Sequence, residues 1–193
     1  MISLPRGLKL FLLGLATATL TAGFSTALVP QVSQAQTGLT IFGGIDPAYR
    51  LNYFIDSNKP RSFDARYYLQ VGKNKVSRDV ISLQIEYPQS FMDSDGEINP
   101  GAIEIRQGDW RGGAIIPVKA ITVGQTADGR ADGRIEIIPE NPIPKGTNFV
   151  IVLSQVRNPS HYGYHYFNLR MTYQGDVVDR YVGTWPLELG AGD

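Results

Sequence analysis

Histidine is the side chain best suited to proton transfer near neutral pH, and the chain has two, His161 and His165. Residues four apart on a strand share a face but lie about 13 Å apart at ~3.3 Å per residue, too far to hold one metal ion. His165 also falls in register with the apolar positions that follow it. We therefore expect His165 to be a hydrogen-bonded histidine at the margin of the core, and we predict no metal centre from the pair.

Alternate carboxylates precede a glycine in the segment Asp93-Ser94-Asp95-Gly96. Such an arrangement can coordinate a cation that prefers oxygen ligands, which makes Asp93 and Asp95 a weak candidate for a calcium site. With Gly96 at position six of a calcium loop, however, the two anchoring positions are a phenylalanine and an alanine, which cannot be ligands. An acidic turn between two strands is the favoured interpretation, because Asp-Gly is itself a common turn signal.

Three tyrosines alternate along one segment, so that Tyr162, Tyr164 and Tyr166 share a strand face with Asn168 and Arg170. Outward tyrosines with polar neighbours can stack on sugars or anchor a protein partner. Tyr162, Tyr164, Tyr166 and Arg170 are therefore the candidate binding residues. The alternative is that a neighbouring strand or loop covers these rings.

The two tryptophans, Trp110 and Trp185, are further candidates for this binding face. In the sequence, Trp110 lies close to two carboxylates, Glu104 and Asp109. Hydrolysis of an envelope polysaccharide requires such a pair of carboxylates. Such a hydrolase is the alternative function. A non-catalytic binding or assembly module is favoured, because the chain has no Gly-x-Ser-x-Gly or His-Glu-x-x-His motif. We expect no cofactor.

The beginning of the chain has the order of a secretory signal peptide. Two basic residues, Arg6 and Lys9, precede an uncharged apolar run at 10–29. Small residues then predict cleavage at the end of a 1–35 signal peptide, which leaves 36–193 as one mature domain. We expect the product in the periplasm, cell envelope or thylakoid lumen. Retention of the apolar run as a membrane anchor is the alternative.

Composition narrows the class of protein further. Eighteen basic residues balance eighteen acidic ones, so the chain has no basic field for nucleic acid. Cysteine is absent, which excludes disulfides and leads us to expect no lipid anchor. No second apolar run reaches spanning length, so we expect no membrane span after cleavage.

Hydrophobic residues recur with period two, which is the spacing of half-buried strands. Turn residues separate the segments, as at Asn158-Pro159 and Gly175-Asp176. The pattern predicts an all-β, immunoglobulin-like antiparallel sandwich of about eight strands. The expected strands lie at 39–45, 63–71, 81–87, 102–106, 115–123, 134–138, 149–156, 164–173 and 177–182.

A family resemblance appears in the C-terminal half, together with the strand at 65–71. It is carried by Ile137-Ile138-Pro139, 142–146, 149–156, Asn158-Pro159 and Gly163-Tyr164. Over 39–189 the chain resembles a family of cyanobacterial secreted proteins catalogued as domain of unknown function 2808. The resemblance implies a cyanobacterial exported β domain. It supplies no activity and no site residues.

Overall fold

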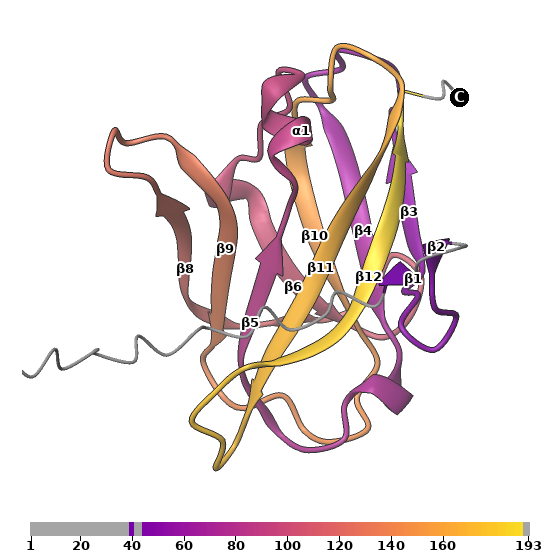
Figure 1. Ribbon diagram of the computed structural model, residues 1–193. Helices are drawn as coiled ribbons and strands as arrows, with labels where there is room; N and C mark the ends of the chain where they lie inside the picture. The colour runs from indigo at the N-terminus through magenta and orange to yellow at the C-terminus, as the bar shows by residue number, and fades with distance from the viewer. Residues whose placement is uncertain (1–38, 41–43, 191–193) are drawn as a thin grey trace, which may run out of the picture. The chain divides into compact units, whose positions relative to one another are not determined.

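The computed structural model describes residues 39–40 and 44–190 (Figure 1). Contacts divide the chain into Met1–Gln34 and Ala35–Asp193. The expected signal peptide, 1–35, lies outside the described residues and stays a prediction. Everything below concerns the second unit. No helix among the residues described is long and apolar enough to cross a membrane.

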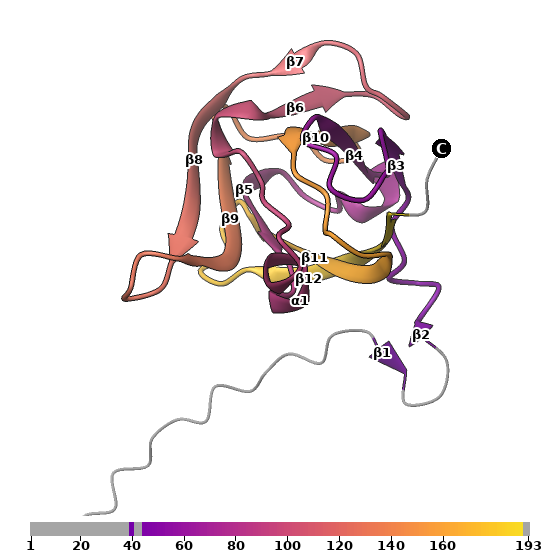
Figure 2. The same cartoon turned by 90° about the horizontal axis from the view of Figure 1, so that it is seen from above.

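Two five-stranded antiparallel sheets face one another, which confirms the predicted all-β sandwich (Figures 1 and 2). Sheet 1 has the order β3-β4-β10-β6-β7. Its strands are β3 (Tyr53–Asp56), β4 (Ala65–Val71), β6 (Ile103–Gln107), β7 (Ile115–Ile116) and β10 (Phe149–Val156). Sheet 2 has the order β12-β11-β5-β9-β8. Its strands are β5 (Val80–Glu86), β8 (Val118–Gln125), β9 (Ala131–Pro139), β11 (Gly163–Tyr173) and β12 (Arg180–Leu189).

The remaining elements are short. A hairpin of β1 (Leu39–Thr40) and β2 (Gly44–Ile45) precedes the sheets. The helical turns are η1 (Lys73–Lys75), α1 (Gln89–Asp93) and η2 (Pro100–Ala102). Of these, α1 covers one end of the sandwich, because its buried Phe91 packs edge-to-face on Phe167 of β11.

Both sides of the sandwich are closed by chain segments that change sheets. Pro117 separates β7 in sheet 1 from β8 in sheet 2, and β8 runs along the side of the two layers in Figure 2. On the other side, the N–H of Thr184 in β12 donates to the carbonyl of Tyr49, and the carbonyl of Thr184 accepts from the N–H of Leu51. The segment that contains Tyr49 and Leu51 then continues into β3 of sheet 1. These crossings shorten the exposed sheet edges, which otherwise favour pairing with other chains.

Alternation along the strands places one continuous core between the sheets. In β11 the inward positions are His165, Phe167, Leu169, Met171 and Tyr173, all buried as the sequence pattern predicted. The central strand β10 is buried on both faces, as expected for its run of apolar residues.

Candidate binding site

The tyrosines of the predicted stripe lie on β11 and point away from the core. Tyr162, at the entry to the strand, is 55% exposed, Tyr164 54% and Tyr166 39%. The alternative that a neighbouring strand or loop covers them is therefore wrong. The start of β11, which carries the tyrosines, is paired with β12, whereas the ladder to β5 begins only at Asn168.

Hydrogen bonds and ring contacts hold the end of the stripe that contains Tyr162 and Tyr164. The Tyr162 hydroxyl donates to the Glu188 carboxylate at 2.8 Å, and the Tyr162 and Tyr164 rings meet edge-to-face with centroids 6.0 Å apart. A hydrogen bond with the Tyr164 hydroxyl and the Glu188 carboxylate both raise the pKa of Tyr162. Tyr162 is therefore a neutral hydroxyl at physiological pH, and the surface presents aromatic faces rather than charge.

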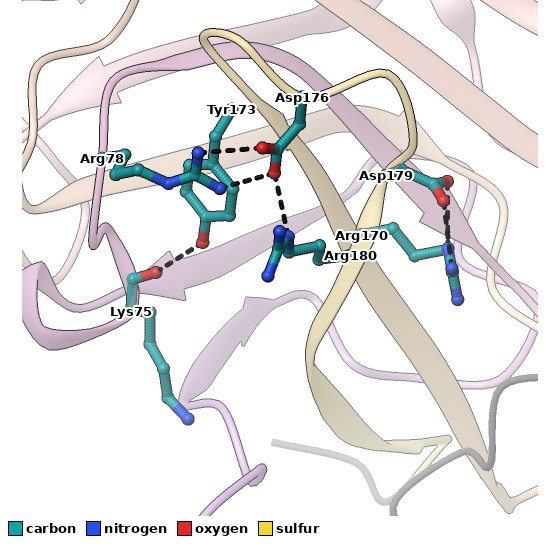
Figure 3. A network of polar contacts seen from close by, with 7 residues as sticks. All are labelled: Lys75, Arg78, Arg170, Tyr173, Asp176, Asp179 and Arg180. Atoms are coloured by element: carbon teal, nitrogen blue, oxygen red, sulfur yellow. Dashed lines mark hydrogen bonds and ion pairs between the residues drawn. The ribbon is translucent and has the colours of Figure 1, made fainter.

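Arg170 lies farther along the same outward face, but its charge is already paired. Its guanidinium donates to both carboxylate oxygens of Asp179, at 2.9 and 3.0 Å, and this partner raises the pKa of Arg170 (Figure 3). The ion pair joins β11 to the end of the hairpin loop that leads into β12. Of the four predicted binding residues, the three tyrosines are exposed and adjacent, whereas Arg170 borders them as part of a structural ion pair.

The same hairpin is braced by a second group of charges (Figure 3). Asp176 accepts from Arg78 at 2.8 Å and from Arg180 at 2.8 Å, and hydrogen bonds from these arginines lower its pKa. Arg78 also lies 4.9 Å from the centroid of the Tyr173 ring. These contacts hold a loop whose tip carries two exposed valines, Val177 and Val178.

The two histidines do not form a catalytic pair. His165 is 5% exposed, packs edge-to-face on Phe91, and lies 3.4 Å from the Ser90 hydroxyl through Nδ1. Burial lowers its pKa. His161 is exposed and lies 3.0 Å from the Ser160 hydroxyl. The interpretation of His165 as a residue at the core margin is confirmed.

The acidic segment forms the end of a short helix and the turn that follows it. Asp93 closes α1 and accepts from Gln89 at 2.8 Å, and the N–H of Gly96 bonds the Phe91 carbonyl at 2.9 Å. Within 39–40 and 44–190, no three acidic or histidine side chains gather as a metal-binding group. The weak calcium candidate at Asp93 and Asp95 stays a prediction.

The two tryptophans have opposite placements. Trp185 is completely buried between the sheets, so the hypothesis that it joins the binding face is wrong. Trp110 is 58% exposed, but it stacks on Phe54 of β3 and so lies over sheet 1, not beside the tyrosines of sheet 2. A period-two pattern cannot reveal this, because Trp110 belongs to a loop.

The carboxylates near Trp110 are engaged elsewhere. Glu104 accepts from Arg106 at 2.8 Å, and Asp109 accepts from the Asn148 amide at 3.1 Å. Both carboxylates are therefore hydrogen-bonded to neighbouring side chains.

Asn158 precedes the tyrosine row, and the sequence pattern identified it only as part of a turn. It is fully buried, and its side chain accepts from the Tyr67 hydroxyl at 2.6 Å. Its amide nitrogen donates to the carbonyls of Ser57 and Lys59 at 3.0 and 2.9 Å. Asn158 therefore ties the loop between β3 and β4 to the loop that leads into Tyr162.

The protein is an immunoglobulin-like β-sandwich with a solvent-facing row of tyrosines on one sheet. The family model described as "Protein of unknown function (DUF2808)" matches residues 39–189, and the chain belongs to that family.

A comparison with solved structures finds similar proteins at low sequence identity. An uncharacterized protein from Nocardia farcinica with an immunoglobulin-like fold is 11% identical, with a TM-score of 0.46 over 74% of this chain and 99% of that one. The collagen-binding domain from a Staphylococcus aureus adhesin is 12% identical, with a TM-score of 0.35 over 69% and 93%. No curated protein matches the sequence. Since fold does not imply function, the function has to be argued from the site.

Proposed function

We propose that the protein is an exported, non-catalytic binding module that holds a protein partner in the cell envelope, periplasm or thylakoid lumen. The observation that carries the proposal is the exposed row of Tyr162, Tyr164 and Tyr166 at the start of β11, where the strand is paired with β12. Tyrosine supplies a large contact area at a small cost in conformational entropy, and for this reason it is enriched at interfaces.

The geometry of the row favours a protein over a sugar as its ligand. The rings rise from the outer face of a sheet, and their cross-strand neighbours on β12 include Glu188 and Pro186. Such a surface suits a broad contact with apolar centres and a polar rim. Arg170 and Asp179 form the paired, polar border of the surface on the side away from Tyr162.

Export rests on the signal-peptide pattern of residues 1–35. Mass spectrometry of the protein isolated from its native host tests this part. We expect a mature chain that begins at Gln36. A chain that retains residues 1–35 would contradict cleavage and support the anchored alternative.

Affinity purification of the tagged protein from fractionated host cells tests the binding surface. We expect a partner that binds the purified wild type directly, with an affinity at least about tenfold weaker for the Tyr164→Ala, Tyr166→Ala double variant. The control is Val177→Ala with Val178→Ala, which removes apolar surface that is more exposed than the tyrosines, at the hairpin tip. A partner that binds the tyrosine variant as tightly as the wild type would refute the assignment.

A further inference from the structure

The loop between β6 and β7 folds back over the outer face of sheet 1. Its Trp110 ring stacks on Phe54 of β3, with centroids 5.3 Å apart and planes 28° apart. The guanidinium of Arg111 lies 5.1 Å from the centroid of Phe54 and 5.5 Å from that of Tyr68, and it binds Asp56 at 2.8 Å. The loop thus covers the outward residues of β3 and β4 with an aromatic and cationic layer.

The backbone holds Trp110 in a conformation that a bulky side chain rarely adopts. Its φ is +61°, between Gly108 at +102° and Gly112 at +72°. At Gly112 a Cβ atom would lie 2.5 Å from the Cβ of Arg106, so this position has to be glycine. A strained, bulky residue persists only when its surroundings over-determine it. The loop contacts fix the indole, which nevertheless keeps more than half of its surface open to solvent.

A cavity of about 360 Å³ opens beside this indole, at the edge of sheet 1. It is lined by Arg50, Leu51, Asn52, Tyr53, Gln70 and Trp110. The floor is firm, because Leu51 is buried and the Tyr53 hydroxyl accepts from the N–H of Glu188 at 3.0 Å. The volume lies at the lower end of the range for small-molecule sites.

The polar side chains around the cavity are available for a ligand. In the part of the chain that the structure describes, the side-chain amides of Asn52 and Gln70 make no hydrogen bond, and Arg50 forms no ion pair. Amides donate and accept hydrogen bonds, as sugar hydroxyls do, and an indole face stacks on the C–H face of a sugar ring. The lining contains no carboxylate that would select a cation.

We propose that this cavity binds a sugar ring of a polysaccharide, stacked on Trp110 and hydrogen-bonded by Asn52 and Gln70. Arg50 gives the site a preference for an acidic sugar, because a guanidinium pairs with a carboxylate through charge-assisted hydrogen bonds. The proposal is independent of the tyrosine surface, which lies on the outer face of the other sheet.

Tryptophan fluorescence tests the proposal directly, because the chain has two tryptophans and only Trp110 of the pair is exposed. The probes are a galacturonate trisaccharide and the corresponding neutral galactose trisaccharide. We expect a saturable change in emission with a dissociation constant on the order of 0.1–1 mM for the acidic probe, and weaker binding of the neutral one. Arg50→Gln should remove that difference.

Variants separate the site from a general effect on folding. By calorimetry, Trp110→Ala should weaken binding at least about tenfold, and Asn52→Ala or Gln70→Ala about three- to tenfold. Asn52→Ala is the clean variant, because Asn52 is exposed and its backbone carbonyl still accepts the N–H of Gln70. Tyr164→Ala should bind both sugars as the wild type does, which keeps this test apart from that of the protein partner.

Two results would overturn the proposal. One is the absence of any change in Trp110 emission up to about 10 mM of both trisaccharides. The other is wild-type affinity in the Asn52→Ala and Trp110→Ala variants, since sugar binding would then lie elsewhere.

Discussion

Replacing Asn158 by alanine removes the polar centre of the end of the sandwich that leads into Tyr162. The wild-type side chain is fully buried and makes three hydrogen bonds, one from the Tyr67 hydroxyl and two to the carbonyls of Ser57 and Lys59. Tyr67 is itself completely buried, and burial raises its pKa. Asn158→Ala therefore leaves a buried neutral hydroxyl without this partner.

The cost follows from these contacts. A buried polar group that loses its partner costs about 1–3 kcal/mol, and each further lost hydrogen bond about 1 kcal/mol where water cannot replace it. We expect Asn158→Ala to lower the free energy of unfolding by about 2–4 kcal/mol. For a domain of this size that lowers Tm by roughly 4–16 °C.

Urea unfolding followed by circular dichroism measures this change, and the Tyr67→Phe variant supplies its control. The double variant Asn158→Ala, Tyr67→Phe lacks both partners, so it should regain about 1–2 kcal/mol relative to Asn158→Ala alone. If Asn158→Ala costs less than about 1 kcal/mol, or if Tyr67→Phe recovers nothing in its background, the stranded hydroxyl is not the source of the cost.

Two further predictions concern acid stability and close backbone contact. Burial lowers the pKa of His165 in the folded protein. The histidines of the unfolded chain titrate near 6.5, so below that pH the unfolded chain binds a proton at His165 more readily than the folded one. The free energy of unfolding therefore falls as the pH drops through about 6.5. Urea unfolding at pH 7.5 and 5.5 should show a smaller pH dependence in His165→Gln than in the wild type; an unchanged pH dependence would contradict the assignment. Gly183→Ala places a Cβ 2.4 Å from the Tyr49 carbonyl oxygen and should lower the free energy of unfolding by about 2–4 kcal/mol, measured by thermal unfolding. In the control Gly163→Ala the nearest contact is 3.5 Å, so the loss should be about 1 kcal/mol or less. Equal losses in the two variants would refute the steric argument.

Period-two patterning predicted the strands that are buried on one or both faces. The strand expected at 149–156 has the bounds of β10, and 164–173 differs from β11 by one residue. The last expected strand, 177–182, is wrong in its start, because Val177 and Val178 form an exposed hairpin tip and β12 begins at Arg180. Their apolar side chains resemble those of a strand, while one of the ion pairs that hold this segment as a loop joins Asp176 to Arg78, 98 positions earlier in the sequence.

Two other segments show how tertiary contacts override local signals. The strand β3 has only four residues, all half-buried, and its pattern is too short to detect. The tetrapeptide Ala-Asp-Gly-Arg occurs twice in succession at 127–134, a composition that on its own favours one flexible loop. Its second copy begins β9 instead, where Gly133 has a φ of +81° and lies against the Tyr87 carbonyl.

The two candidate surfaces differed in how far sequence could predict them. The tyrosines share one strand, so alternation alone places them on one face. The cavity draws on residues 50–53, 70 and 110, which only the pairing of β3 with β4 and the folding of the β6–β7 loop bring together. The spacing of these residues in the sequence does not indicate that they line one cavity.

A sandwich without cysteine has to fix its sheets by other means, and in this protein the same contacts support both surfaces. Trp185 of β12 donates its indole N–H to the carbonyl of Gln70 in β4 at 3.1 Å. Asn58, beyond β3, donates to the carbonyl of Glu188 and accepts from the N–H of Gly190. β12 flanks the tyrosines, while Gln70 lines the cavity. The contacts of β12 with the segment around β3 and β4 therefore support both proposed surfaces.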